Sequence, residues 1–140
     1  MTPTEMTQLH HAEPTGHRAW SEAEFSTILS ANNALSVICD DGFALGQFLL
    51  DEAELLLIMT KPERRSLGLG HRILARFEQQ ALQNSVARII LEVADSNLAA
   101  RALYTSNGYQ QIAVRKNYYT FPNGNHVDAI VMEKHLQNNN

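Results

Sequence analysis

The sequence predicts an α/β domain built around one mixed β-sheet that is flanked by helices, and three observations support this fold class. Apolar, strand-like runs alternate with helix-spaced segments in the middle of the chain, which is typical of parallel strands joined by helices. Strand-like pairs separated by turn residues stand at both ends, and they predict antiparallel hairpins. The length of 140 residues suits one domain with its own core, so we expect residues 1–140 to form a single domain.

Two helices are expected before the first strand. Pro3 can open a short helix that runs to Leu9, because proline is favoured at the first helical position. The segment Ser21–Glu24 is a capping box, and Trp20 before it can pack on Phe25 as a hydrophobic staple. A second helix therefore begins there.

The remaining elements follow from apolar runs bounded by turn residues. Residues Asp40–Gly42 are a hairpin signal, the run Leu55–Met59 indicates a fully buried strand, and Gly108 is placed to end a helix. The last two strands flank a loop that contains Phe121–Gly124. We expect strands over 34–39, 43–50 and 53–60, a helix over 70–83, a strand over 86–93, a helix over 98–106, and strands over 109–116 and 127–134.

The segment Arg65–Gly70 is the most informative about function, because it joins a central strand to a helix. Free amides at a helix start, with the positive end of the helix dipole behind them, bind anions, and glycine lets phosphates approach the backbone. A P-loop is excluded because His71-Arg72 follow Gly70 in place of Lys and Ser/Thr, and Ile73 breaks the dinucleotide fingerprint. A phosphate-binding turn is expected, and a glycine-rich turn without a ligand is the alternative.

This Arg-x-x-Gly-x-Gly pattern between strand and helix resembles the pyrophosphate-binding motif of the GNAT superfamily of acetyl-CoA-dependent N-acetyltransferases. The resemblance continues over most of the chain, from Trp20 to His135. The segments that look like the second half of a GNAT domain are Leu91-Glu92-Val93, Ser96-Asn97, Ala102-Leu103-Tyr104 and Asn107-Gly108-Tyr109. The segments that look more narrowly like the bacterial ribosomal-protein-alanine N-acetyltransferases are Trp20-Ser21-Glu22, Arg115-Lys116-Asn117-Tyr118-Tyr119 and Asp128-Ala129-Ile130-Val131-Met132.

The resemblance implies the GNAT fold, with one departure. Members of the family usually begin with a strand ahead of the first helix, whereas the polar segment before Trp20 has no strand-like run. We therefore expect the sheet to lack that first edge strand, on the side where the acceptor enters.

The resemblance also assigns roles to site residues. Glu92 matches the general base and Tyr104 the proposed general acid, while Tyr118 and Tyr119 would shape the acceptor pocket. From the residues alone, a solvated strand-end carboxylate is equally reasonable for Glu92, and a core tyrosine for Tyr104. Two tyrosines at a strand end more often pack on the sheet. Asn97 matches a position that binds the pantetheine arm, and it is also a good helix N-cap. The residues implied to contact acetyl-CoA are Ile58, Met59, Thr60, Arg65, Ser66, Leu67, Gly68, Leu69, Gly70, His71, Asn97 and Tyr104.

The predicted function is therefore transfer of the acetyl group of acetyl-CoA to an amine. By resemblance, the expected acceptor is the N-terminal α-amine of a protein, a ribosomal protein that begins with alanine. The alternatives are a GNAT enzyme acting on a small amine or a lysine side chain, and a non-catalytic acyl-CoA-binding domain. The presence of both Glu92 and Tyr104 argues against the non-catalytic alternative. A Rossmann-type oxidoreductase is disfavoured by Ile73.

Composition narrows the partners further. The net charge of −4 disfavours nucleic acid and suits a cationic acceptor. Cys39 is the only cysteine and no H-E-x-x-H or Cys-x-x-Cys motif is present, so neither an intramolecular disulfide nor a metal site is expected. No apolar run reaches about 18 residues, and we expect a cytoplasmic protein that does not bind membranes.

Overall fold

The computed structural model describes residues 1–12, 19–121 and 123–136. This part of the chain contains four α-helices, one short 3₁₀-helix and six β-strands. Their bounds, in chain order, are α1 Pro3–Ala12, α2 Glu22–Ser30, β1 Ala34–Ile38, β2 Gly42–Leu49, β3 Glu52–Thr60, η1 Pro62–Arg64, α3 Leu69–Gln83, β4 Arg88–Ala94, α4 Leu98–Ser106, β5 Gln110–Thr120 and β6 His126–His135.

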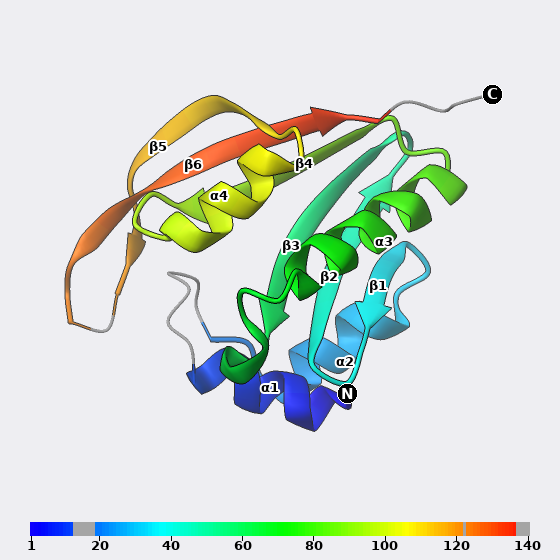
Figure 1. The fold of residues 1–140 in the computed structure, drawn as a ribbon, viewed down its shortest axis with the longest axis horizontal. Helices are drawn as coiled ribbons and strands as arrows, with labels where there is room; N and C mark the ends of the chain where they lie inside the picture. Colours follow the sequence, from blue (N-terminus) through cyan, green and yellow to red (C-terminus); the bar gives the residue numbers. More distant parts are fainter. Residues whose placement is uncertain (13–18, 122, 137–140) are drawn as a thin grey trace.

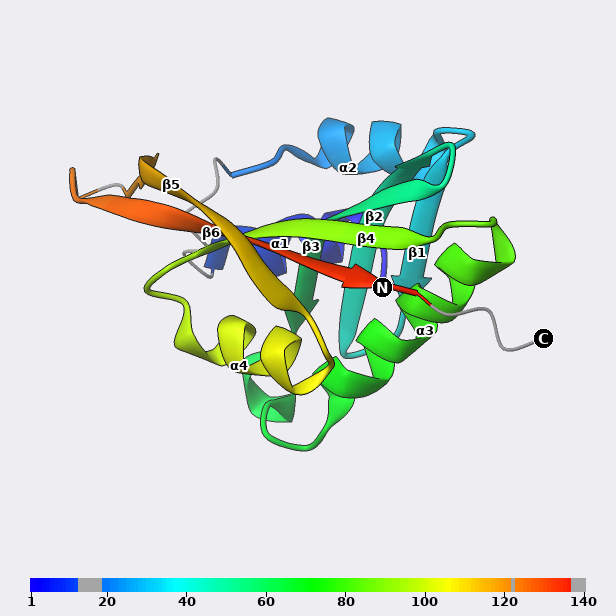
Figure 2. The same ribbon diagram turned by 90° about the horizontal axis from the view of Figure 1, so that it is seen from above.

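The six strands form one mixed sheet in the order β1-β2-β3-β4-β6-β5. Only β3 and β4 pair in parallel, and all other neighbours are antiparallel. Helices α3 and α4 lie on one side of the sheet and α2 lies on the other, while the β5–β6 hairpin projects beyond the helices (Figures 1 and 2). Within the described residues no strand precedes β1, which forms one edge of the sheet, so the expected mixed sheet without a first edge strand is confirmed.

The start of α2 has the predicted capping box. The Ser21 hydroxyl accepts a hydrogen bond from the Glu24 amide at 3.1 Å, and the Glu24 carboxylate accepts one from the Ser21 amide at 3.2 Å. The Trp20 and Phe25 rings lie 5.2 Å apart, as the staple requires. These contacts seat α2 against the sheet, where Phe25 is fully buried.

The sheet separates two cores, and a β-bulge in β3 changes which of them the side chains of this strand enter. Leu45 of β2 lies opposite Leu57 and its neighbour Gly46 lies opposite Leu55, so Leu56 is an extra residue in β3. Leu55 packs into the core beneath α3, whereas Leu57 packs into a second core with residues of α1 and α2. The apolar run predicted a fully buried strand, and this prediction was wrong. Leu56 and Ile58 are only half-buried.

The bulge also separates β3 from β4. Their parallel register covers only Glu52–Leu55 and Arg88–Leu91, and it does not continue beyond these residues. A bulge bends its strand and increases the local twist, which accounts for the divergence. The two central strands thus leave a gap in the middle of the sheet, with β3 residues 56–60 on one side and β4 residues 92–94 on the other.

Strand β5 is longer than expected, because it continues past Lys116 to Thr120. Its pairing with β6 is irregular between Arg115 and Tyr119, where Asn117 has a left-handed φ of 52°. The Asn117 amide donates to the Asp128 carboxylate at 2.9 Å, which holds the irregularity in place. Of the predicted loop after this strand, Pro122 lies outside the described residues.

Candidate active site

The glycine-rich turn enters α3 as the sequence predicted. Gly68 is the N-cap of α3 and has a φ of 80°, and Ser66 is also left-handed, with a φ of 65°. Glycine adopts this region at no steric cost, and it has no side chain that could cap the helix. The first intrahelical bond at this end runs from the Arg72 amide to the Gly68 carbonyl at 3.2 Å. The amides before Arg72 are therefore available to an anion.

A cavity of about 830 Å³ opens beside this turn. Such a volume accommodates a ligand much larger than a metal ion or a single phosphate. The predicted cofactor-contact residues that line it are Ile58, Met59, Thr60, Arg65, Ser66, Gly68, Leu69, Gly70, His71 and Asn97. Leu67 and Tyr104 are not among the residues that line it: Leu67 is exposed, and Tyr104 lines a second, smaller hollow.

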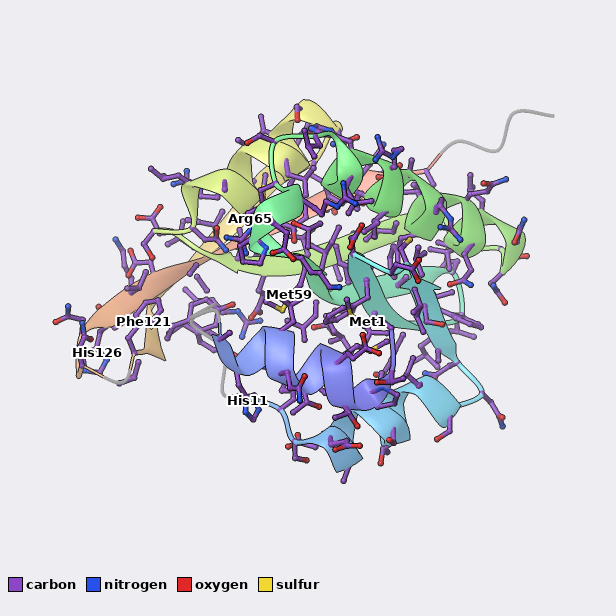
Figure 3. All side chains as sticks on the ribbon, turned by 60° about the horizontal axis from the view of Figure 1, so that its bottom comes forward. Met1, His11, Met59, Arg65, Phe121 and His126 are labelled. Atoms are coloured by element: carbon purple, nitrogen blue, oxygen red, sulfur yellow. The ribbon has the colours of Figure 1, made fainter. Side chains whose placement is uncertain are left out.

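The cavity wall carries positive charge next to the helix start. This charge comes from Arg64 and Arg65, which both line it. Arg65 donates to the Thr60 carbonyl at 3.4 Å, which ties the turn to the end of β3. Figure 3 shows Arg65 beside the start of α3 and Met59 on the side of the sheet that faces α1. Two guanidinium groups and a helix N-terminus around one cavity suit a polyanionic ligand such as a pyrophosphate.

A smaller hollow of about 40 Å³ lies in the gap between β3 and β4. It is lined by Glu92 and Tyr104 together with the bulged segment Leu55–Ile58. Four residues line both hollows, namely Ile58, Ala94, Asn97 and Ala100. The gap therefore connects the large cavity, on the α3 and α4 side, with the surface on which Glu92 lies.

Glu92 has a charged partner that the sequence did not reveal. The Glu92 Oε1 atom lies 3.1 Å from the Nε atom of Arg115 on β5. The two strands are separated by β6, so the Arg115 side chain extends across one strand to reach Glu92. Glu54 belongs to the same group of charges: burial and the nearby Glu92 raise its pKa, and Arg115 opposes the shift.

Tyr104 and Asn97 both come from α4, which covers the gap. Tyr104 is buried and its ring packs against Tyr109 at 5.7 Å. Burial raises the pKa of Tyr104, so its hydroxyl keeps its proton throughout the neutral range. Asn97 caps α4, because its Oδ1 atom accepts the Ala100 amide at 3.2 Å, and it also lines both hollows. The helix-cap alternative for Asn97 thus holds without excluding contact with a ligand.

The two tyrosines near the end of β5 lie in different environments. The side chain of Tyr118 is 51% exposed, and Tyr119 is only 5% exposed. Their rings meet edge to face at 5.2 Å, and Tyr119 packs on Ala94 and Ala129. Burial raises the pKa of Tyr119, and Glu92 contributes to the shift, which places this phenol on the Glu92 side of the gap. Both rings therefore border the surface through which an acceptor could approach Glu92.

Among the residues that the structure describes, no three His, Cys, Asp or Glu side chains gather in a way that could hold a metal ion. No helix in that part of the chain is long and apolar enough to span a bilayer.

Comparison with known proteins agrees with this geometry. The Acetyltransferase (GNAT) family matches residues 4–109. The [ribosomal protein bS18]-alanine N-acetyltransferase of Escherichia coli K12 is 34% identical over 134 residues, which cover 92% of this chain and 90% of that protein. The protein of the same name from Haemophilus influenzae is 39% identical over 95 residues, which cover 68% of this chain and 64% of that protein.

Solved structures give the same result. The crystal structure of the ribosomal-protein-S18-alanine N-acetyltransferase from Escherichia coli is similar, with a TM-score of 0.83 and 29% identity over 99% of this chain and 90% of that one. The crystal structure of Arabidopsis thaliana NAA60 in complex with a bisubstrate analogue has a TM-score of 0.82 at 14% identity. The match covers 96% of this chain and 94% of that one. At that identity the likeness to NAA60 is one of fold alone.

Proposed function

The chain belongs to the acetyltransferase (GNAT) family and is an acetyl-CoA-dependent N-acetyltransferase, and we propose that its acceptor is the N-terminal α-amine of a protein that begins with alanine. The observation that carries the proposal is the gap between β3 and β4, which joins an anion-binding cavity to a carboxylate on the opposite surface. Two substrates can meet in such a gap from opposite sides of the sheet.

We assign the large cavity to acetyl-CoA. The amides at the start of α3, together with Arg64 and Arg65, suit its pyrophosphate. The edge of β3 that faces the gap offers backbone groups that are not paired with β4, and the amide-containing pantetheine arm can hydrogen-bond to such groups. This arrangement directs the acetyl end of the cosubstrate into the gap, towards Glu92 and Tyr104.

The chemistry then follows from two side chains. The α-amino group of a peptide has a pKa of about 8, so it must lose a proton before it attacks the thioester. Glu92 accepts this proton, directly or through a water, and the amine forms the new amide bond as the carbon–sulfur bond breaks. Tyr104 keeps its proton at neutral pH and can donate it to the departing sulfur.

The choice of a protein N-terminus as acceptor rests on the relatives. Those from Escherichia coli and Haemophilus influenzae are named as N-acetyltransferases of alanine in ribosomal protein bS18. Tyr118 and Tyr119 border the approach to Glu92 here, and aromatic rings suit contact with an extended peptide. A lysine side chain or a small amine remains the competing acceptor.

A single mixture tests the proposal. The protein and acetyl-CoA are incubated with an alanine-starting peptide that contains an internal lysine, with the same peptide blocked at its N-terminus, and with a panel of small amines. Fragmentation spectra should place the acetyl group on the α-amine, and the blocked peptide should stay unmodified. Acetylation of lysine, or of small amines alone, would contradict the acceptor assignment while leaving the acetyltransferase activity intact.

A further inference from the structure

We propose that Arg115 occupies the place of the acceptor's ammonium group on Glu92 in the free enzyme, and that the acceptor displaces it on binding. Arg115 is then a residue that tunes acceptor affinity rather than a fixed support of the base. This inference rests on the proposed function, because it concerns the charged amine of that acceptor.

The ion pair has the geometry of a displaceable contact. The Nε atom of Arg115 lies 3.1 Å from Oε1 of Glu92, and the Arg115 side chain is 55% exposed whereas that of Glu92 is 23% exposed. Arg115 lies opposite the buried Ala129 of β6, whose side chain is only a methyl group. The guanidinium therefore covers Glu92 from the solvent side, where an incoming amine would have to arrive.

A second arginine of the same sheet shows the contrast with a fixed pair. Arg88 contacts two carboxylates, those of Glu52 at 2.7 Å and Glu133, and its side chain is 31% exposed. It bridges β3, β4 and β6 in the part of the sheet where β3 and β4 are paired. Arg115 pairs with one carboxylate, and its guanidinium also lies 5.3 Å from the centre of the exposed Tyr118 ring. That ring can retain the guanidinium through a cation–π contact after it leaves Glu92.

The surrounding charges favour a cation at this position. Glu54 on β3 and Glu92 on β4 are close enough that Glu92 raises the pKa of Glu54, and Arg115 counteracts this. Tyr119 on β5 faces the same carboxylate, and its pKa is raised as well. Without Arg115, the two carboxylates would lose a guanidinium whose charge offsets their mutual repulsion. An ammonium group restores the balance, and it donates hydrogen bonds to the same carboxylate oxygens.

Competition between the Arg115 guanidinium and the ammonium group of the acceptor predicts the direction in which the KM for the peptide changes. If Arg115 must leave before the amine binds, its removal lowers the KM for a peptide with a free N-terminus. Exposed ion pairs contribute little, so the expected decrease is about two- to fivefold. The N-acetylated product peptide carries no ammonium group, and its inhibition constant should therefore not fall. Removal of a residue that merely supports Glu92 would not lower the KM for the free peptide.

The test compares Arg115→Gln with Arg115→Lys, which keeps the charge, and with Lys116→Gln, which removes a neighbouring charge that pairs with Asp128 at 3.6 Å. Steady-state kinetics give KM and kcat for an alanine-starting peptide, and product inhibition is measured with its acetylated form. We expect a lower KM for Arg115→Gln only, with Arg115→Lys and Lys116→Gln close to the unmodified enzyme.

Two results would overturn the inference. An unchanged or higher KM in Arg115→Gln, or a loss of kcat that Arg115→Lys restores, would make Arg115 a positioning residue for Glu92. An unmodified enzyme that does not acetylate the peptide at all would remove both this inference and the proposed acceptor. If the unmodified enzyme acetylates the peptide and Arg115→Gln keeps its KM, only the inference fails.

Discussion

Replacing Gly70 with aspartate should separate cosubstrate binding from folding. Gly70 is the second residue of α3 and lies outside the left-handed region. A Cβ atom there would meet only the Leu103 side chain, at 3.5 and 3.7 Å, which is ordinary contact. A carboxylate in the first turn interacts favourably with the helix dipole, by about 0.3–1 kcal/mol. We therefore expect the free energy of unfolding of Gly70→Asp to equal or exceed that of the unmodified protein.

Binding of acetyl-CoA should respond in the opposite direction. The new carboxylate would lie beside the amides that we assign to the pyrophosphate, where it repels the phosphates and competes for those donors. A hydrogen bond to a charged group is worth about 1.5–3 kcal/mol, so the loss of one such bond raises the Kd by about 10- to 150-fold. Charge repulsion adds to this loss. A 100-fold increase is a reasonable working value for the assay.

Thermal unfolding with and without acetyl-CoA measures both effects. At a concentration of 100 times the Kd, a ligand stabilises the unmodified protein by about 2.7 kcal/mol. The same concentration would stabilise a variant with a 100-fold weaker Kd by only about 0.4 kcal/mol. At about 4 °C per kcal/mol, the ligand-induced increase in Tm falls from about 11 °C to below about 2 °C.

Two control variants complete the experiment. Gly70→Ala adds a side chain without charge and should give an intermediate ligand shift. Gly68→Ala places a Cβ atom at a φ of 80° and should lower the stability of the free protein by about 1–2 kcal/mol. A Gly70→Asp protein that keeps the full ligand shift would refute the binding assignment. One that unfolds without ligand would show that Gly70 serves the fold.

Three further substitutions test the other assigned groups. Glu92→Gln should lower kcat by about 10²–10⁴-fold, and the activity should recover in part as the pH rises and the amine deprotonates. An unchanged pH–rate profile would argue against Glu92 as the base. Tyr104→Phe should lower kcat with little change in acetyl-CoA affinity by calorimetry, whereas a matched loss of affinity would indicate a packing role. The pKa of Glu54 is raised above its ordinary value of 4.5, so its ionised form costs stability at higher pH. Glu54→Gln should therefore raise Tm at pH 7. The gain should vanish below about pH 4, where the carboxyl of the unmodified protein is also protonated. A gain in Tm that persists at low pH would point to packing.

Local signals predicted the fold well, because each one is contained in a few consecutive residues. The capping box at Ser21–Glu24 is present, the helix Leu98–Ser106 has the expected ends, and α3 begins within one residue of the expected start. The glycine-rich turn is likewise a local pattern, and its expected position between strand and helix is confirmed. Turns and caps are decided by the side chains of neighbouring residues, which a sequence displays directly.

Features that depend on distant partners were not predictable in the same way. The extra residue Leu56 exists only relative to the register of β2, and an apolar run shows no sign of it. The partner of Glu92 comes from β5, two strands away in the sheet. The order of β4, β6 and β5 is set by tertiary packing, so Arg115 could be named within a motif but not paired with its carboxylate. The catalytic and binding roles of the site residues remain predictions that the kinetic experiments address.

The extra residue in β3 also limits which insertions and deletions the gene can tolerate. A regular strand alternates its side chains between two faces, and the extra Leu56 interrupts this alternation, so that Leu55 and Leu57 face different cores although they are two residues apart. Loss of Leu56 alone would keep Leu57 and Met59 in the α1–α2 core, because Leu55 and Leu57 would then alternate as neighbours opposite Gly46 and Leu45. A three-nucleotide deletion of Leu56 would therefore spare both cores and act on the bend that separates β3 from β4, whereas the same deletion in the two-residue turn at Leu50 and Asp51 would leave too short a connection for the present register of β2 and β3.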